Sequence, residues 1–162
     1  MEFKTQFQQT VVDFICHKLK PGSPVICLSD AGKGKTTALA YAALDVVGSV
    51  VVWCPGKRCA DGFISIVRTI LNKRRQGYDH FDDYVKVSAN KKIYTYPVGQ
   101  ETWDVHLEED VECVLFDDAQ HLHPMVLRRL VQKMGNKKVA ITSNYLINEL
   151  QGVVKVKITN NN

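Results

Sequence analysis

The sequence predicts an α/β fold in which a mostly parallel, five-stranded sheet is covered by helices on both faces. Apolar runs of strand length alternate along the chain with segments whose apolar residues recur at helical spacing. Most of these runs are continuous, as expected of strands buried on both faces of a parallel sheet. With 162 residues the chain is long enough to bury its own core, so residues 1–162 are predicted to form a single domain.

The first elements have clear local signals. Residues 1–22 are expected to form an N-terminal helical segment, because apolar residues recur at helical spacing over 5–19 and Pro21 follows. The short apolar run at residues 25–28 predicts the first strand. A glycine-rich turn then leads into an alanine-rich segment, which predicts a helix over residues 35–47.

The middle of the chain is less regular. Residues 50–53 predict a second buried strand, and apolar spacing predicts a helix over residues 63–75. Residues 76–110 are expected to be an irregular insertion, with short strands at 85–87 and 93–96.

The last third of the chain returns to strong signals. Residues 111–116 and 138–143 predict the third and fourth strands. Pro124 suits the first turn of a helix that extends to about residue 134. Apolar residues alternate with lysines over 154–158, which predicts a half-exposed edge strand, and the terminal asparagines 160–162 are expected to be a frayed tail.

The net charge of +4 is distributed unevenly. Residues 97–120 contain eight Asp or Glu and no Lys or Arg, whereas residues 55–96 and 121–162 are both basic. This pattern indicates either a polyanion-binding face beside a metal-binding centre or a solvated surface of mixed charge.

The composition also limits the compartment. No apolar run approaches ~20 residues and charged residues interrupt the first 20, so neither a membrane span, a membrane partner nor a signal peptide is expected. The five cysteines include no C-x-x-C pair, which favours a reducing, cytoplasmic compartment, that of a host cell if the protein is viral. A zinc site is a less favoured alternative, because the usual ligand spacings are missing. Its candidate ligands are Cys54, Cys59, His121 and His123.

The turn after the first predicted strand matches a phosphate-binding loop. Seven of the eight positions of G-x-x-x-x-G-K-[ST] are met, and Ser29 replaces the first glycine. Backbone N–H groups of such a loop surround phosphate oxygens, Lys35 is expected to reach the β- and γ-phosphates, and Thr36 to ligate Mg²⁺. A glycine-rich loop that binds nothing is the alternative. The expected nucleotide contacts are Ser29, Asp30, Ala31, Gly32, Lys33, Gly34, Lys35, Thr36 and Thr37.

Two carboxylates follow the third predicted strand. Asp117 ends the apolar run, so it is expected at the carboxyl end of a strand, where ligands gather in open α/β sheets. We expect Asp117 to hold Mg²⁺ and Asp118 to act as the general base toward the attacking water. A solvated acidic turn is the alternative. Nucleotide kinases share the first motif, but the Asp-Asp-Ala-Gln sequence favours a hydrolase.

These motifs resemble those of superfamily 1 helicases, including the viral type. Residues 31–37 resemble their motif I, residues 52–60 their motif Ia, and residues 116–120 the D-E-A-Q form of their motif II. The resemblance covers about residues 5–135. It implies a P-loop NTPase domain with a RecA-like core, equivalent to one motor domain rather than two.

The resemblance implies roles for further residues. Gln8 or Gln9 is placed like the glutamine that reads adenine, and Lys57 and Arg58 like residues that contact the nucleic-acid backbone. Asp118 stands where these helicases have glutamate. Because its side chain is one methylene shorter, the geometry toward the attacking water changes and slow hydrolysis is expected.

The segment after the fourth predicted strand departs from these helicases. Residues 141–150 instead resemble the sensor-1 segment of AAA-plus helicase loaders. This second resemblance implies that Asn144 helps to position water beside the γ-phosphate. A plain turn residue after a strand is the alternative for Asn144.

A stretch from Arg74 to Trp103 combines cations and aromatic rings, as single-strand binders do. Arg74 and Arg75 are therefore candidate nucleic-acid contacts. Packing of the rings against the sheet is an equal alternative. The rings are Tyr78, Phe81, Tyr84, Tyr94, Tyr96 and Trp103, and the other cations are Lys86, Lys91 and Lys92.

Together, the motifs favour an ATP-binding and ATP-hydrolysing helicase-like core that requires Mg²⁺ and acts on single-stranded RNA or DNA. No arginine has an obvious finger position against the γ-phosphate, so weak turnover is expected until a protein partner or a homo-oligomer supplies one. Two alternatives stay open. One is an AAA-plus-like helicase loader or protein-binding regulator, and the other is a nucleotide-dependent binding module without useful turnover.

Overall fold

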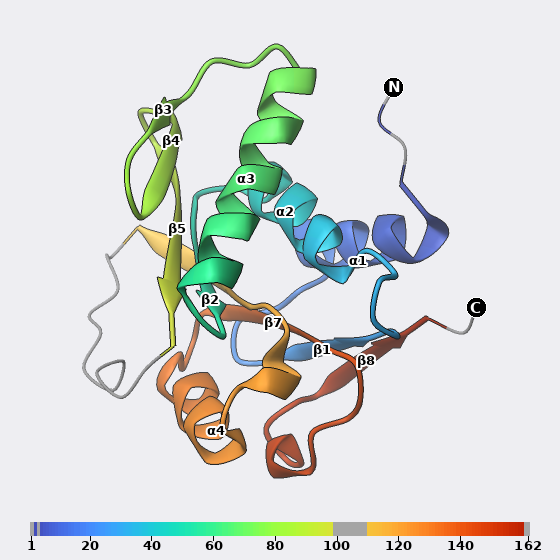
Figure 1. Cartoon of the computed structure of the whole chain (residues 1–162). Coiled ribbons are helices and arrows are strands. Elements are labelled where there is room, and N and C mark those ends of the chain that lie inside the picture. The colour runs from blue at the N-terminus through green and yellow to red at the C-terminus, as the bar shows by residue number, and fades with distance from the viewer. Residues whose placement is uncertain (1, 3, 99–109, 161–162) are drawn as a thin grey trace.

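One mixed sheet with helices on both of its faces forms the framework of the protein (Figure 1). The computed structural model describes residues 2, 4–98 and 110–160. The helices are α1 (Gln6–His17), α2 (Lys35–Asp45), α3 (Lys57–Lys73) and α4 (Pro124–Lys133), with 3-10 turns η2 (Ala119–His121) and η3 (Asn148–Leu150). The strands are β1 (Val25–Leu28), β2 (Ser49–Cys54), β3 (Asp79–His80), β4 (Tyr84–Ser88), β5 (Lys91–Pro97), β6 (Val111–Phe116), β7 (Lys138–Ser143) and β8 (Val156–Thr159).

The described strands form a mostly parallel sheet in the order β3-β4-β5-β2-β6-β7-β1-β8. The six strands from β5 to β8 in this order are parallel, whereas β4 pairs antiparallel with both β3 and β5. All five predicted strands are present, and the α/β fold class is confirmed.

The predicted count of five strands is wrong, because the segment expected to be irregular adds three more. Both short strands expected there form, as β4 and β5, and β3 pairs with β4. In β4 and β5 the buried residues Val85, Ile93 and Thr95 alternate with partly exposed lysine and tyrosine side chains. These strands therefore lack the continuous apolar run that identifies a strand buried on both faces.

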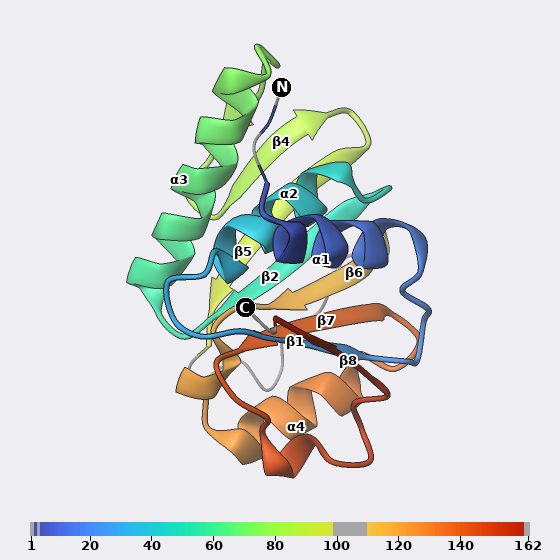
Figure 2. The same cartoon turned by 90° about the vertical axis from the view of Figure 1, so that its right-hand side faces the viewer.

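Two apolar clusters lie on opposite faces of the sheet. α1, α2 and α3 cover one face, whereas α4 and η3 pack on the other (Figures 1 and 2). Trp53 and Phe116 are fully buried in the cluster under α4. Helices on both faces were predicted, and they leave the ends of the strands as the place where polar side chains meet.

The helix boundaries follow local capping chemistry. Thr5 and Gln8 form a reciprocal capping box at the start of α1. Pro124 occupies the first turn of α4, as expected. α3 begins at Lys57, six residues before the predicted start at residue 63, because its first turn is mainly polar and carries no apolar periodicity.

The carboxyl ends of three adjacent strands meet at one edge of the sheet. β6, β7 and β1 are parallel neighbours and end at Phe116, Ser143 and Leu28. The carboxylate pair follows β6, Asn144 follows β7, and the predicted phosphate-binding turn follows β1. The topology therefore gathers the predicted site residues.

Two negative findings concern the described ranges 2, 4–98 and 110–160. No helix there has the length and hydropathy needed to cross a membrane. Nor does any group of three or more His, Cys, Asp or Glu side chains gather as a metal site there, so the alternative of a zinc site at Cys54, Cys59, His121 and His123 is not supported. All five cysteines are unpaired.

Candidate nucleotide-binding site

The turn between β1 and α2 has the backbone of a phosphate-binding loop. Gly32 and Gly34 have φ angles of 76° and 84°, in the left-handed region that favours glycine. A Cβ added at Gly34 would lie 2.3 Å from the Nε2 atom of Gln8, so a side chain there would displace the end of the Gln8 side chain. α2 begins at Lys35, and its free N–H groups face the turn.

Lys35 is folded against its own loop. Its Nζ atom donates hydrogen bonds of 2.8 Å to the backbone oxygens of Ser29 and Asp30. Burial lowers the pKa of Lys35, and the nearby carboxylates of Asp118, Asp117 and Asp30 oppose that shift. The ammonium group of Lys35 is thus held by two uncharged carbonyl oxygens, which a charged phosphate oxygen can replace.

Asp117 is the buried acid of the site, with 1% of its surface exposed. Thr36 Oγ1 donates to its carboxylate oxygens, at 3.0 and 3.1 Å, and Thr142 Oγ1 donates at 3.1 Å. Desolvation, followed by the charge of Asp118, raises the pKa of Asp117 to about 6. A hydroxyl and a carboxylate from two distant segments therefore meet, and both are oxygen ligands that suit Mg²⁺.

Asp118 sits in a strained backbone conformation at the end of β6. Its φ of 50° is unusual for a residue with a side chain. Its backbone N–H donates to Thr142 Oγ1 at 3.1 Å, which ties the turn to the neighbouring strand β7. The Asp118 side chain then lines the same cavity as Lys35 and Thr36.

Asn144 has an unpaired polar atom at this cavity. Its backbone N–H donates to Gln120 Oε1 at 3.2 Å, whereas its buried side-chain Oδ1 has no hydrogen-bond partner among the described residues. A buried polar atom without a partner is uncommon in proteins and indicates a place for water or a ligand. The cavity measures about 340 Å³ and is lined by Ala31, Gly32, Gly34, Lys35, Thr36, Thr37, Asp118, Gln120, His121 and Asn144.

Gln8, rather than Gln9, reaches the loop. Gln8 Nε2 donates to the Gly34 oxygen at 3.1 Å, and a second cavity of about 380 Å³ lies beside this contact. That cavity is lined by Thr5, Gln6, Phe7, Gln8, Gly32, Lys33, Gly34 and Asn160. Gln9 is exposed and donates to Asp13 at 2.7 Å.

The predicted nucleic-acid contacts lie at opposite ends of α3. Lys57 and Arg58 are exposed in its first turn, at the same edge of the sheet as the loop. Arg74 lies about 25 Å away along the helix axis. It forms ion pairs with Glu2 and Asp45, which hold its pKa above the usual range, while the exposed Arg75 follows it with a φ of 55°. The four cations therefore do not form one surface.

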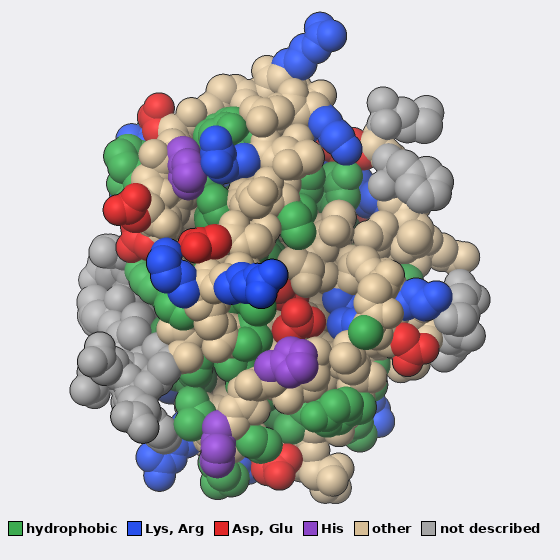
Figure 3. Space-filling view, in the orientation of Figure 1, with side chains coloured by type: hydrophobic (Ala, Val, Ile, Leu, Met, Phe, Trp, Pro, Cys, Tyr) green, Lys and Arg blue, Asp and Glu red, His purple; other side chains and the backbone are tan. Residues whose placement is uncertain are grey.

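The wider surface beside the site has mixed charge. Lys and Arg side chains on the face in Figure 3 are scattered among acidic and histidine side chains rather than gathered into one basic area. Part of the acidic segment 97–120 lies outside the described residues, and so does the whole of Trp103.

Three contacts of the site could not be predicted from the motifs. Thr142 bonds Asp117, Gln120 bonds the backbone of Asn144, and Asn160 Nδ2 donates to Ser29 Oγ at 2.9 Å. Asn160, expected to belong to a frayed tail, is thus held at the loop, and residues 161–162 lie outside the described residues. The alternation of β8 predicted an edge strand, and that strand delivers Asn160 beside the loop.

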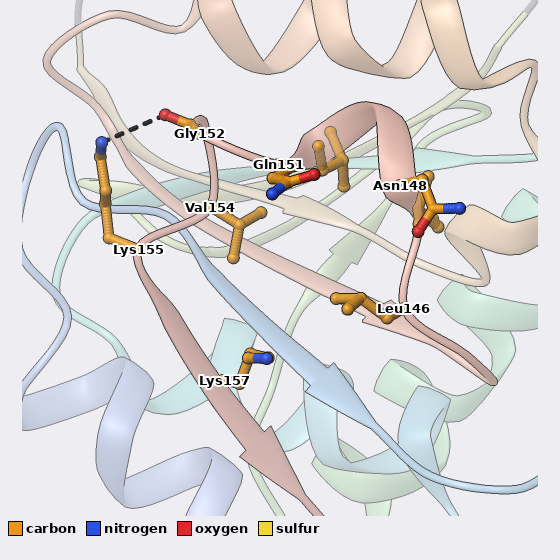
Figure 4. Close-up of a pocket in the computed structure, with 9 residues that line it drawn as sticks. Leu146, Asn148, Gln151, Gly152, Val154, Lys155 and Lys157 are labelled. Carbon is orange, nitrogen blue, oxygen red and sulfur yellow. Dashed lines mark hydrogen bonds between the residues drawn. The ribbon is translucent and has the colours of Figure 1, made fainter.

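A third cavity, of about 300 Å³, lies away from the loop between η3 and β8 (Figure 4). Leu146 and Val154 line it, and Lys155 Nζ donates to the Gly152 oxygen at 3.1 Å. Its lining includes no acid, histidine or cysteine. The candidate chemistry is therefore at the loop.

The fold of the chain is that of RecA-like P-loop ATPase domains. No protein-family model matches the sequence, and no curated protein does. The large terminase of a thermophilic bacteriophage matches 98% of this chain with a TM-score of 0.67 and 13% identity, over 46% of its own length. A Saccharomyces cerevisiae Dbp5 variant, bound to a Gle1 variant and IP6, matches all of this chain with a TM-score of 0.70 and 13% identity, over 48% of its length. The chain thus spans about half the length of these proteins.

Proposed function

We propose that this chain binds and hydrolyses ATP as a helicase-like core that acts on nucleic acid. The observation that carries the proposal is the contact of Thr36 with Asp117 beneath a loop that also holds Lys35. Thr36 and Asp117 are 81 positions apart in the sequence, and a loop with a purely structural role would not need their contact beside Lys35. The shared fold with a terminase and with Dbp5 supports the proposal.

The residues of the loop are assigned to the phosphates. The N–H groups of the turn from Ser29 to Thr37 surround them, with Lys35 reaching the terminal phosphates. Thr36 and Asp117 would hold Mg²⁺, which supplies neutralisation of phosphate charge when bound. Gln8 is assigned to the adenine base, because it lines the cavity on the far side of the loop.

The assigned catalytic groups lie around the other cavity. Asp118 acts as the base toward the attacking water, and Asn144 orients that water through its unpaired Oδ1 atom. The cavity that these residues line contains no arginine. We therefore assign the missing cation to a protein partner or to a second copy of the chain.

Lys57 and Arg58 are assigned to the nucleic-acid backbone. They are exposed, and they follow the end of β2 at the edge of the sheet that carries the site. Arg74 is already occupied by two carboxylates.

The test is the rate of ATP hydrolysis by the full chain with Mg²⁺, alone and with single-stranded RNA or DNA. We expect slow turnover alone, several-fold stimulation by a single strand, and loss of both in Lys35→Ala. Rapid turnover without any partner would contradict the assignment of an external arginine. Lys73→Ala, at the far end of α3, is the matched control.

A second candidate function is a loader or regulator of the AAA-plus type that acts on another protein. The position and unpaired oxygen of Asn144 favour it. Stimulation by a protein partner, but by no nucleic acid, would select this second function. ATP binding without turnover under any condition would leave only a nucleotide-dependent binding module.

A further inference from the structure

The β4–β5 hairpin has two chemically different faces. Tyr84 lies opposite Tyr94, and Lys86 lies opposite Lys92. Directly opposed residues of an antiparallel pair point to the same face, as do residues two apart in one strand. These two tyrosines and two lysines, with Tyr96, therefore share one face.

The other face of the hairpin belongs to the hydrophobic core. Val85 and Ile93 are fully buried in the cluster that α1, α2 and α3 cover. On the opposite face, Tyr94 and Tyr96 pack against the second apolar cluster, under α4. Tyr84, Lys86 and Lys92 belong to neither apolar cluster, so core packing leaves their role open.

The rings on the tyrosine face of the hairpin form a ladder, here defined as Phe81, Tyr84, Tyr94 and Tyr96. Phe81 stacks on Tyr84 with 4.5 Å between ring centroids and 16° between planes. The centroids of Tyr84 and Tyr94 are 5.3 Å apart, and those of Tyr94 and Tyr96 are 6.3 Å apart. The aromatic ladder crosses from the β3–β4 turn to the end of β5.

Exposure increases outward along these rings. Trp53, which contacts Tyr96 at 5.5 Å, is fully buried and packs on Phe116. The three tyrosines are partly exposed, and Phe81 is 45% exposed. Core packing explains Trp53 and part of the surface of Tyr94 and Tyr96, but it does not explain the exposed surface of Phe81 and Tyr84.

Two cations accompany the ladder. Lys92 Nζ lies 5.5 Å from the Tyr84 ring centre. Neither Lys86 nor Lys92 forms an ion pair among the residues that the structure describes. Their charges are therefore available to a ligand.

We propose that the aromatic ladder is a stacking surface for an unpaired strand of nucleic acid, with Lys86 and Lys92 beside its phosphates. Every base has a planar face, so stacking on tyrosine is tolerant of sequence and of sugar, and neighbouring cations hold the backbone. The inference rests on the proposed action on nucleic acid and names a site for it.

The position of the ladder agrees with the proposed function. β5 ends at Pro97, beside Cys54 at the end of β2, and the Val98 N–H donates to the Cys54 oxygen at 2.8 Å. Lys57 and Arg58 follow three and four residues after Cys54. A strand on the ladder would thus lead toward the edge of the sheet that carries the nucleotide site.

The first test measures fluorescence anisotropy of labelled 12-nucleotide oligo(U) and oligo(dT) with the full chain. Tyr84→Leu with Tyr94→Leu should weaken binding of both strands about tenfold or more, because stacking is lost. Tyr84→Phe with Tyr94→Phe keeps both rings and should bind within about twofold of wild type. Equal binding by the leucine variant would overturn the proposal.

A second variant keeps the test decisive if the leucine variant does not fold. Lys86→Gln with Lys92→Gln should flatten the slope of log affinity against log salt by about 1.4, since each phosphate contact on a single strand contributes about 0.7. Lys155→Gln with Lys157→Gln, at the opposite edge of the sheet, is the matched control and should leave the slope unchanged.

The outcomes separate the inference from the proposed function. If the ladder variants keep wild-type affinity for single-stranded nucleic acid and Lys57→Ala with Arg58→Ala lowers that affinity, the ladder proposal alone is overturned. A wild-type chain that binds neither strand, with or without ATP, would overturn the ladder together with the action on nucleic acid.

Discussion

Asp117 lowers the stability of the folded chain when its carboxylate is ionised. Its carboxylate is almost fully buried next to a second acid, and two threonine hydroxyls are its side-chain donors. Burial raises the pKa of Asp117 to about 6, above the value of 3.8 for an ordinary aspartate. The folded chain therefore holds a proton between these pH values that the unfolded chain releases, and ionisation of Asp117 destabilises the fold.

We predict that Asp117→Asn stabilises the protein at neutral pH while abolishing hydrolysis. Because asparagine does not ionise, its advantage in free energy of unfolding over wild type should grow between pH 4 and pH 7.5, by about 3 kcal/mol at most. Urea unfolding at both pH values, without nucleotide or Mg²⁺, measures this change. Asp110→Asn, at an exposed carboxylate, is the control. An advantage that shrinks as the pH rises would contradict the prediction.

Individual residues differ in how far sequence could locate them. Lys35 and Thr36 belong to a motif whose backbone path is local, so their neighbourhood follows from adjacent residues. Thr142 gives no such signal, since a threonine near a strand end is common. It meets Asp117 only because β6 and β7 pair in one register, which the linear sequence does not display.

At the scale of elements, α3 holds two sets of candidate nucleic-acid contacts apart. Lys57 and Arg58 lie at its start, and Arg74 and Arg75 follow its end. Its N-terminal end lies at the edge of the sheet that carries the β1–α2 loop, whereas Arg74 at its other end forms ion pairs with both Glu2 and Asp45. Arg74 also lies 5.8 Å from the Tyr41 ring centre. The two ends should therefore respond differently to mutation.

We predict that Lys57→Ala with Arg58→Ala weakens nucleic-acid binding and flattens its salt slope by about 1.4, without loss of stability. Arg74→Ala should lower the free energy of unfolding by about 1 kcal/mol and leave the affinity unchanged. Anisotropy titrations at several salt concentrations and urea unfolding measure the two effects. A loss of affinity in Arg74→Ala as large as in the double variant would show that the helix ends act together.

The strands of the inserted segment, β3, β4 and β5, could be predicted only in part. Sequence indicated two short strands there, but not that they would extend the main sheet. Tyrosine and lysine on alternate positions suit an open sheet face as well as an irregular loop. Pairing of β5 with β2 decides between an open sheet face and an irregular loop, and it depends on residues 43 positions apart, such as Val50 and Ile93.

At the scale of the whole molecule, three strand ends converge on one site. A nucleotide held by the loop and by Asp117 would join α2 to the centre of the sheet, so its binding energy adds to the stability of the entire fold. Asn160, near the end of the described chain, reaches the same loop through Ser29.

We predict that a non-hydrolysable ATP analogue with Mg²⁺ raises the Tm. At a hundredfold excess over its Kd the gain is about 2.7 kcal/mol, or roughly 5–10 °C for a chain of this size. Thermal unfolding followed by circular dichroism measures the shift, which Lys35→Ala should largely remove. Lys73→Ala should retain it, and an equal shift in Lys35→Ala would place the nucleotide elsewhere.

The fold class and the phosphate loop could be read from local patterns, because apolar runs and glycine spacing act on neighbouring residues. The same holds for the two acids that follow β6. Strand register, by contrast, joins Asp117 to Thr142, Gln120 to Asn144 and the tyrosines into one ladder. These contacts depend on pairing between distant strands, whose energy is shared over the whole sheet, so only the tertiary structure brings them together.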